Sequence, residues 1–104
     1  MASIRWTVGA QQDLRMIVEY ISRDSATYAA AIAGRIVAVV ERLRLHPKLG
    51  RVVPEYEDET IRELIVGNYR VVYRFRGQRV GLIAVVHGGR ELLRRLTDKP
   101  WDFG

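Results

Sequence analysis

The sequence predicts a single α+β domain in which an N-terminal strand and an α-helical hairpin pack on an antiparallel β-sheet, followed by a short C-terminal helix or tail. Helical periodicity marks two segments before residue 46, and three later runs, 61–66, 69–75 and 80–86, are rich in Val, Ile and Tyr. Because only short turns separate these runs, they should pair as an antiparallel meander. The 104 residues are expected to form one domain, 1–104, in which 97–104 is a flexible tail.

The first segments of the chain predict a strand and a helix. Residues 3–6 are a strand candidate, and Thr7 is suited to cap the helix that follows. That helix should cover about residues 10–23. Its apolar positions follow the i, i+3, i+4, i+7 spacing of a buried helical stripe: Leu14, Ile17, Val18 and Ile21.

A second helix should start after a cap at Asp24 or Ser25 and run to about residue 45, before Pro47. Its expected apolar stripe is Tyr28, Ile32, Ile36, Val39 and Leu43. The link between the helices is so short that they must form an antiparallel hairpin. Gly34 is expected to allow close approach of the first helix. Residues 51–60, with four acidic side chains, should form a surface connection.

Alternation along the middle run separates a core face from a basic face. The core face, expected to lie under the helices, holds Tyr69, Val71, Tyr73 and Phe75. The opposite face, expected to be an exposed basic platform, holds Arg70, Val72, Arg74 and Arg76. The run 80–86 has almost no polar interruption, so it should lie inside the sheet with both faces covered.

Charge is unevenly distributed along the sequence. The formal net charge is +5, and residues 60–95 hold 8 basic and 2 acidic side chains, whereas residues 1–59 hold 8 of each. This asymmetry favours an anionic partner, either nucleic acid or an acidic protein segment. There is no cysteine, no apolar run long enough to span a membrane and no signal-peptide pattern, so a cytoplasmic protein without membrane association is expected.

The candidate chemical sites are few. His46 and His87 are far apart and have no partners at ligand spacing, so neither a metal site nor a cofactor is expected. Histidine often serves as a general acid or base, which makes His87 a candidate for that role, although an imidazole bonded to the following turn is the simpler interpretation. The remaining candidates are arginines that could bind phosphate or could equally form a solvated strand face: Arg62, Arg70, Arg74, Arg76, Arg79 and Arg90.

Several of these residues lie in motifs that resemble a known family. The chain carries His-Pro-Lys-Leu-Gly-Arg at 46–51, Gly-Asn-Tyr-Arg-Val-Val-Tyr at 67–73 and His-Gly-Gly-Arg at 87–90. These motifs and their order resemble the RelE/ParE superfamily of toxins from bacterial and archaeal toxin-antitoxin modules, over about residues 3–93. The resemblance implies a RelE/ParE-like fold, a small twisted antiparallel sheet with the helical hairpin packed on it.

Two mechanisms occur on this fold. RelE-like members cleave mRNA in the ribosomal A site, and their pattern would make Arg70, Arg90 and His87 the catalytic candidates. The lysines of that pattern would fall at Ile61 and Glu63, and its C-terminal tyrosine near residue 96, so the nuclease site looks incomplete. ParE-like members, associated with plasmid stabilization, instead inhibit DNA gyrase, and the resemblance is closer to that branch. A degenerate, non-toxic interaction module is a third possibility.

Either toxic branch implies partners. The resemblance implies a cognate antitoxin whose acidic, partly disordered C-terminal segment wraps the toxin in a hetero-oligomer. The expected target is DNA gyrase, or alternatively the ribosome and mRNA. The residues expected to contact the target are Arg62, Arg70, Arg74, Arg76 and Arg90, with the tail after residue 92. Arg70 and Arg90 are expected to lie outside the core, so replacing either with alanine should leave the fold intact.

Overall fold

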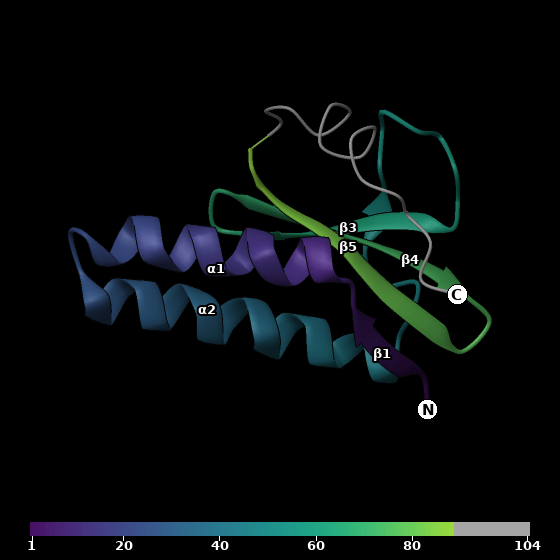
Figure 1. The fold of residues 1–104 in the computed structure, drawn as a ribbon. Coiled ribbons are helices and arrows are strands. Elements are labelled where there is room, and N and C mark those ends of the chain that lie inside the picture. Colours follow the sequence, from purple (N-terminus) through teal and green to yellow (C-terminus); the bar gives the residue numbers. More distant parts are fainter. Residues whose placement is uncertain (89–104) are drawn as a thin grey trace.

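The helical hairpin lies on one face of a five-stranded sheet, as the ribbon in Figure 1 shows. This computed structural model describes residues 1–88, so Arg90, the predicted C-terminal helix and the predicted tail lie outside the described residues. The elements are β1 (Ser3–Trp6), α1 (Val8–Ser22), α2 (Ala26–Glu41), η1 (Arg42–Arg44), β2 (Arg51–Val52), β3 (Ile61–Val66), β4 (Tyr69–Arg76) and β5 (Arg79–His87).

The strand order is β1-β5-β4-β3-β2. The meander β3-β4-β5 is confirmed, and β5 lies inside the sheet between β1 and β4. The sheet is mixed rather than purely antiparallel, because β1 pairs parallel with β5. Gly67 and Gly77 each occupy the first position of a two-residue turn with φ of +57°, a conformation that glycine adopts without strain.

Both helices begin at the predicted caps. The Thr7 hydroxyl accepts the Ala10 amide at 3.1 Å, and the Ser25 hydroxyl accepts the Tyr28 amide at 3.0 Å. The predicted stripe of α2 is partly wrong, because Tyr28 is 55% exposed and Ala29 is buried in its place. The expectation for Gly34 is also wrong, since no atom of the first helix lies within 4 Å of the position that a Cβ would take.

Each face of the sheet is covered by its own apolar cluster. The larger cluster, between the helices and the sheet, confirms the predicted core face with Val71, Tyr73 and Phe75. The opposite face carries a second cluster of Val53, Ile61, Val72, Ile83 and Ala84, packed against Tyr56 and Val86. The expected exposed basic platform is therefore wrong. The segment after β2 is the expected surface connection in that most of its acidic side chains are exposed, but its Val53 and Tyr56 also cover this face.

Candidate functional site

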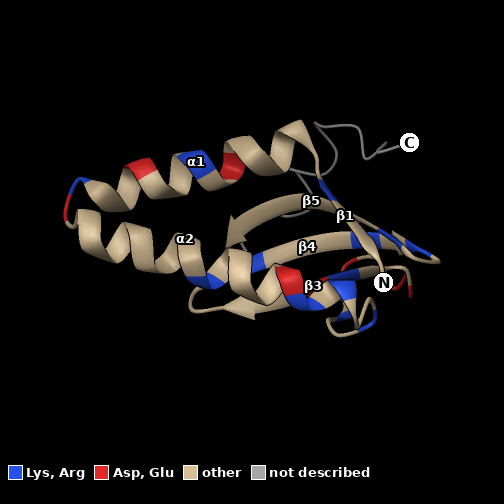
Figure 2. Cartoon of the chain, turned by 90° about the horizontal axis from the view of Figure 1, so that it is seen from below, with Lys and Arg blue, Asp and Glu red and all other residues tan. Residues whose placement is uncertain are grey.

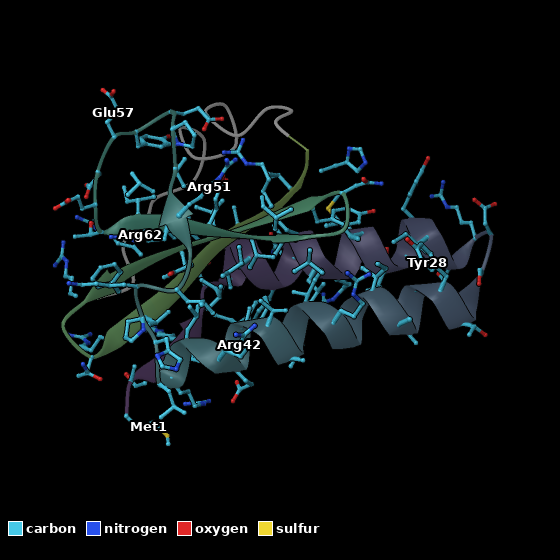
Figure 3. All side chains as sticks on the ribbon, turned by 180° about the vertical axis from the view of Figure 1, so that it is seen from behind. Met1, Tyr28, Arg42, Arg51, Glu57 and Arg62 are labelled. Carbon is cyan, nitrogen blue, oxygen red and sulfur yellow. The ribbon has the colours of Figure 1, made fainter. Side chains whose placement is uncertain are left out.

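Arg70 lies at the centre of a buried cluster of charges on the sheet face away from the helices. Its Nε donates to Glu63 Oε1 at 2.5 Å, and its two terminal nitrogens donate to the carboxylate oxygens of Glu55 at 2.7 and 2.8 Å. Arg51 Nε, from β2, donates to the other Glu63 oxygen at 2.6 Å. Figure 3 labels Arg51 on this side of the sheet. We call these four residues the charge cluster.

The charge cluster has a role in the fold, because its central residues, Arg70 and Glu63, are buried. The side chains of Arg70 and Glu63 are 8% and 0% exposed, while those of Glu55 and Arg51 are 26% and 63% exposed. Hydrogen bonds from Arg70 hold the pKa of the Glu55 carboxyl below its ordinary value. Hydrogen bonding to Glu55 raises the pKa of Arg70, although burial opposes the shift. Arg70 is thus a permanently charged residue committed to two carboxylates, and its expected place outside the core is wrong.

The register of the β3–β4 hairpin explains why this pairing forms. Ile65 lies opposite Arg70, so Glu63, two residues away on the same face, is the diagonal neighbour of Arg70. The acidic segment after Val53 then brings Glu55 over the same face. The sequence signal was a glutamate between Ile61 and Ile65 on one face of β3, where a buried carboxylate demands a partner.

The other predicted arginines do not gather around Arg70. Arg62 lies on the helix side, where Nη1 donates to Gly50 O at 3.0 Å and the guanidinium carbon lies 5.7 Å from the Phe75 ring centroid. Arg74 shares the face of Arg70, but its Nε is buried without a hydrogen bond in the described part of the chain. Arg76 is exposed at the end of β4. The predicted cluster is therefore divided among two faces and one end of the sheet.

His87 is exposed at the end of β5 and meets the ring of Tyr69 edge-on, with the ring centroids 5.3 Å apart. It lines an open hollow together with Arg70, Glu55 and Arg51. Two of the three nuclease candidates, Arg70 and His87, therefore line the same hollow. The guanidinium of Arg70, however, is already hydrogen-bonded to carboxylates.

A second hollow lies at the opposite end of the sheet, beside the segment 46–50. Buried Tyr73 fixes this segment, because its hydroxyl donates to Pro47 O at 2.7 Å and accepts the Gly50 amide at 2.9 Å. Burial raises the pKa of the Tyr73 phenol, which therefore stays a neutral donor. A Cβ on Gly50 would lie 2.6 Å from Glu63 O, so only glycine fits against β3 here.

Residues 1–88 contain no group of three or more His, Asp or Glu side chains placed to hold a metal ion. Within the same residues, neither helix is both long and apolar enough to cross a membrane.

Comparison with known proteins places the chain among toxins. The family described as the ParE toxin of the type II toxin-antitoxin system parDE matches residues 4–92. A solved structure described as the chromosomal ParDE TA system from P. aeruginosa is similar at 23% identity with a TM-score of 0.69, covering 85% of this chain and 97% of that one.

Another solved structure, described as a YoeB/ParE toxin from Agrobacterium tumefaciens, is similar at 19% identity with a TM-score of 0.56, covering 84% of this chain and 98% of that one. No curated protein sequence matches this chain. At these identities the two structures show the shared fold.

Proposed function

Because the chain belongs to the ParE toxin family of type II toxin-antitoxin systems, we propose that it inhibits growth by poisoning DNA gyrase and that a cognate antitoxin neutralises it. The observation that carries the choice of target is the charge cluster. Arg70, which would bind phosphate in a RelE-like nuclease, is hydrogen-bonded to Glu55 and Glu63 instead.

The chemistry of RNA cleavage conflicts with this cluster. Cleavage needs a base for the 2'-hydroxyl, an acid for the leaving oxygen and a cation for the charge that develops between them. An RNA phosphate that approached Arg70 would have to displace a carboxylate bound through two hydrogen bonds and would then be repelled by it. Arg70 also exchanges no proton near neutral pH. A toxin that acts by binding avoids these difficulties.

We propose that gyrase is contacted by those arginines of the predicted set that remain accessible. Arg76 is exposed at one end of the sheet, and Arg62 and Arg74 are half-buried. Arg90 belongs to the same proposal and lies outside the described residues. Gyrase acts on DNA in the cytoplasm, so the toxin would work there.

The antitoxin is proposed to bind through an acidic, partly disordered C-terminal segment that folds on binding. The excess of basic residues over 60–95 supports this choice. Binding would cover the toxin and prevent its contact with gyrase.

Purified components give the first test. The chain is incubated with gyrase, ATP and plasmid DNA, and in parallel with ribosomes that carry mRNA. Cleaved plasmid trapped on gyrase, with intact mRNA, supports the proposal. mRNA cut only in the presence of ribosomes, with normal supercoiling, would assign the alternative nuclease function and make His87 a catalytic candidate.

Matched variants locate the contact. Arg76→Gln should reduce gyrase poisoning, whereas Arg35→Gln should not, because Arg35 is an exposed cation of α2 outside the predicted cluster. Equal poisoning by both variants would remove Arg76 from the contact surface. Pulse labelling of cells after induction without antitoxin should then show DNA synthesis falling before protein synthesis.

A further inference from the structure

The hollow beside the segment 46–50 combines an apolar floor with a cationic rim. Its volume is about 660 Å³, within the usual range of about 300–1,000 Å³ for binding sites. Pro47, Leu49 and Phe75 line it with apolar surface, and Leu49 is 38% exposed. We call this feature the basic hollow.

The rim cations come from separate elements. Arg42, at the end of α2, and Lys48 line the basic hollow and are exposed. Gly77 and Gln78, in the β4–β5 turn, form the opposite wall. Within residues 1–88, no carboxylate forms an ion pair with Arg42 or Lys48. Figure 2 shows Lys and Arg gathered at this end of the molecule, and Figure 3 labels Arg42 here, at the end of α2 away from Tyr28.

The walls of the basic hollow are fixed before any partner arrives. The Tyr73 hydroxyl holds the segment 46–50 through Pro47 O and the Gly50 amide. Across the hollow, the Ser3 amide donates to Gln78 O at 2.8 Å and ties the β4–β5 turn to β1. A rigid site loses little entropy on binding, which favours even a short ligand.

The shape and chemistry of this site distinguish between anionic partners. Single-stranded nucleic acid usually binds by stacking its bases on exposed aromatic faces, but Phe75 is only 9% exposed and Arg62 lies over its ring. Duplex DNA presents phosphates, which would meet the rim but leave the apolar floor in contact with water. A peptide with a bulky apolar side chain between carboxylates can cover the apolar floor and pair with the rim cations at the same time.

We propose that the basic hollow is a docking site for an acidic peptide segment that inserts one bulky apolar side chain over Leu49 and Pro47 and places carboxylates beside Arg42 and Lys48. Charge complementarity sets the register, and burial of the apolar side chain supplies most of the affinity. The site lies at the far end of β4 from His87.

The test is a titration of the full-length, 15N-labelled chain with the peptide acetyl-Asp-Glu-Phe-Glu-Asp-amide, followed by amide chemical shifts. Two matched peptides replace either the Phe by Ser or all four carboxylates by their amides. We expect the first peptide to shift the amides of Leu49, Gly77 and Gln78, and both matched peptides to bind several-fold more weakly. The experiment contains no gyrase, so its outcome is separate from that of the gyrase assay.

Variants of the protein complete the test. Arg42→Gln and Lys48→Gln should each weaken binding about two- to fivefold, the usual range for an exposed ion pair, and Leu49→Ser should weaken it without changing its salt dependence. Arg35→Gln is the matched control and should bind as the wild type does.

Three results would overturn the proposal. One is the absence of shifts at about 5 mM peptide, where even a millimolar affinity is visible. A second is a set of shifts confined to the Ile65–Tyr69 end of the sheet. The third is tighter binding of a short DNA duplex to the same amides with the same dependence on Lys48, which would assign the rim to phosphate.

Discussion

Replacing Arg70 with alanine should destabilise the protein strongly, although this arginine reads in the sequence as a surface residue. The substitution leaves Glu63, with a side chain 0% exposed, facing only Arg51, and Glu55 loses a pair of hydrogen bonds. Breaking a buried ion pair by removing one partner costs about 3–5 kcal/mol, because the remaining charge is buried without compensation. Domains of this size have total stabilities of about 5–15 kcal/mol, so the loss is a large fraction.

The assay is urea unfolding followed by circular dichroism, with exposed Arg35→Ala as the control. We expect Arg70→Ala to lose at least about 3 kcal/mol, or about 12 °C or more in Tm, and Arg35→Ala to change little. The double variant Arg70→Met/Glu63→Met should be more stable than Arg70→Ala, because Glu55 and Arg51 retain access to water. Arg70→Ala within about 1 kcal/mol of wild type would refute this account of the charge cluster.

The same variants separate folding from target contact. Loss of toxicity in Arg70→Ala has two explanations, since the variant is both destabilised and lacks a cation. If Arg70→Met/Glu63→Met is folded and toxic, Arg70 has only a structural role. If it is folded and harmless, the charge cluster contributes to target contact as well as to folding.

Three further predictions concern the same packing. Gly50→Ala should destabilise the folded protein by about 1–3 kcal/mol, because the new Cβ would lie 2.6 Å from a backbone atom. Gly34→Ala, in open space on α2, should instead stabilise it by about 0.5–1 kcal/mol. Midpoints of urea unfolding measure both changes. Tyr73→Phe should cost about 1–3 kcal/mol by leaving the buried Gly50 amide unpaired, less than the roughly 3–5 kcal/mol of Tyr73→Ala; equal losses would contradict the role of the hydroxyl. The pKa of Glu55 is lowered in the folded state, so Glu55 should contribute fully to the free energy of unfolding above its ordinary pKa of about 4.3. That contribution should disappear as the pH falls through the lowered value. In Arg70→Met/Glu63→Met the free energy of unfolding, measured at several pH values, should fall less over the same range.

The sequence predicted the strands well because local pattern decides them. Two-residue turns fix the hairpin registers, and alternation then places Tyr73 in the core. The side of α2 that faces the core was harder to predict, because its many alanines can lie on either side of the helix. Nothing in the local sequence decides whether Tyr28 or Ala29 is buried. The parallel pairing of β1 with β5 joins residues about 75 positions apart, for which the sequence carries no local signal.

The largest error in the site came from treating alternation as evidence of exposure. Period 2 assigns Arg70 to a face, but it does not say what covers that face. Here Val53 and Tyr56, in a segment that looked like an acidic surface connection, cover it. Glu63 counted in the sequence as a missing lysine of the nuclease pattern, yet its buried position makes it the partner of Arg70.

The charge cluster also explains where this toxin can present positive charge. A lysine at position 63 would leave Arg70 beside another cation on a face able to hold phosphate, whereas the glutamate that is present neutralises Arg70 and fixes Arg51 as well. Arg62 is held by backbone carbonyls on the helix side. Of the arginines on β3 and β4, the exposed one is therefore Arg76, at the end of β4, whereas Arg62 and Arg74 are half-buried. The proposed contact with gyrase should accordingly depend more on Arg76 than on the arginines of the sheet faces.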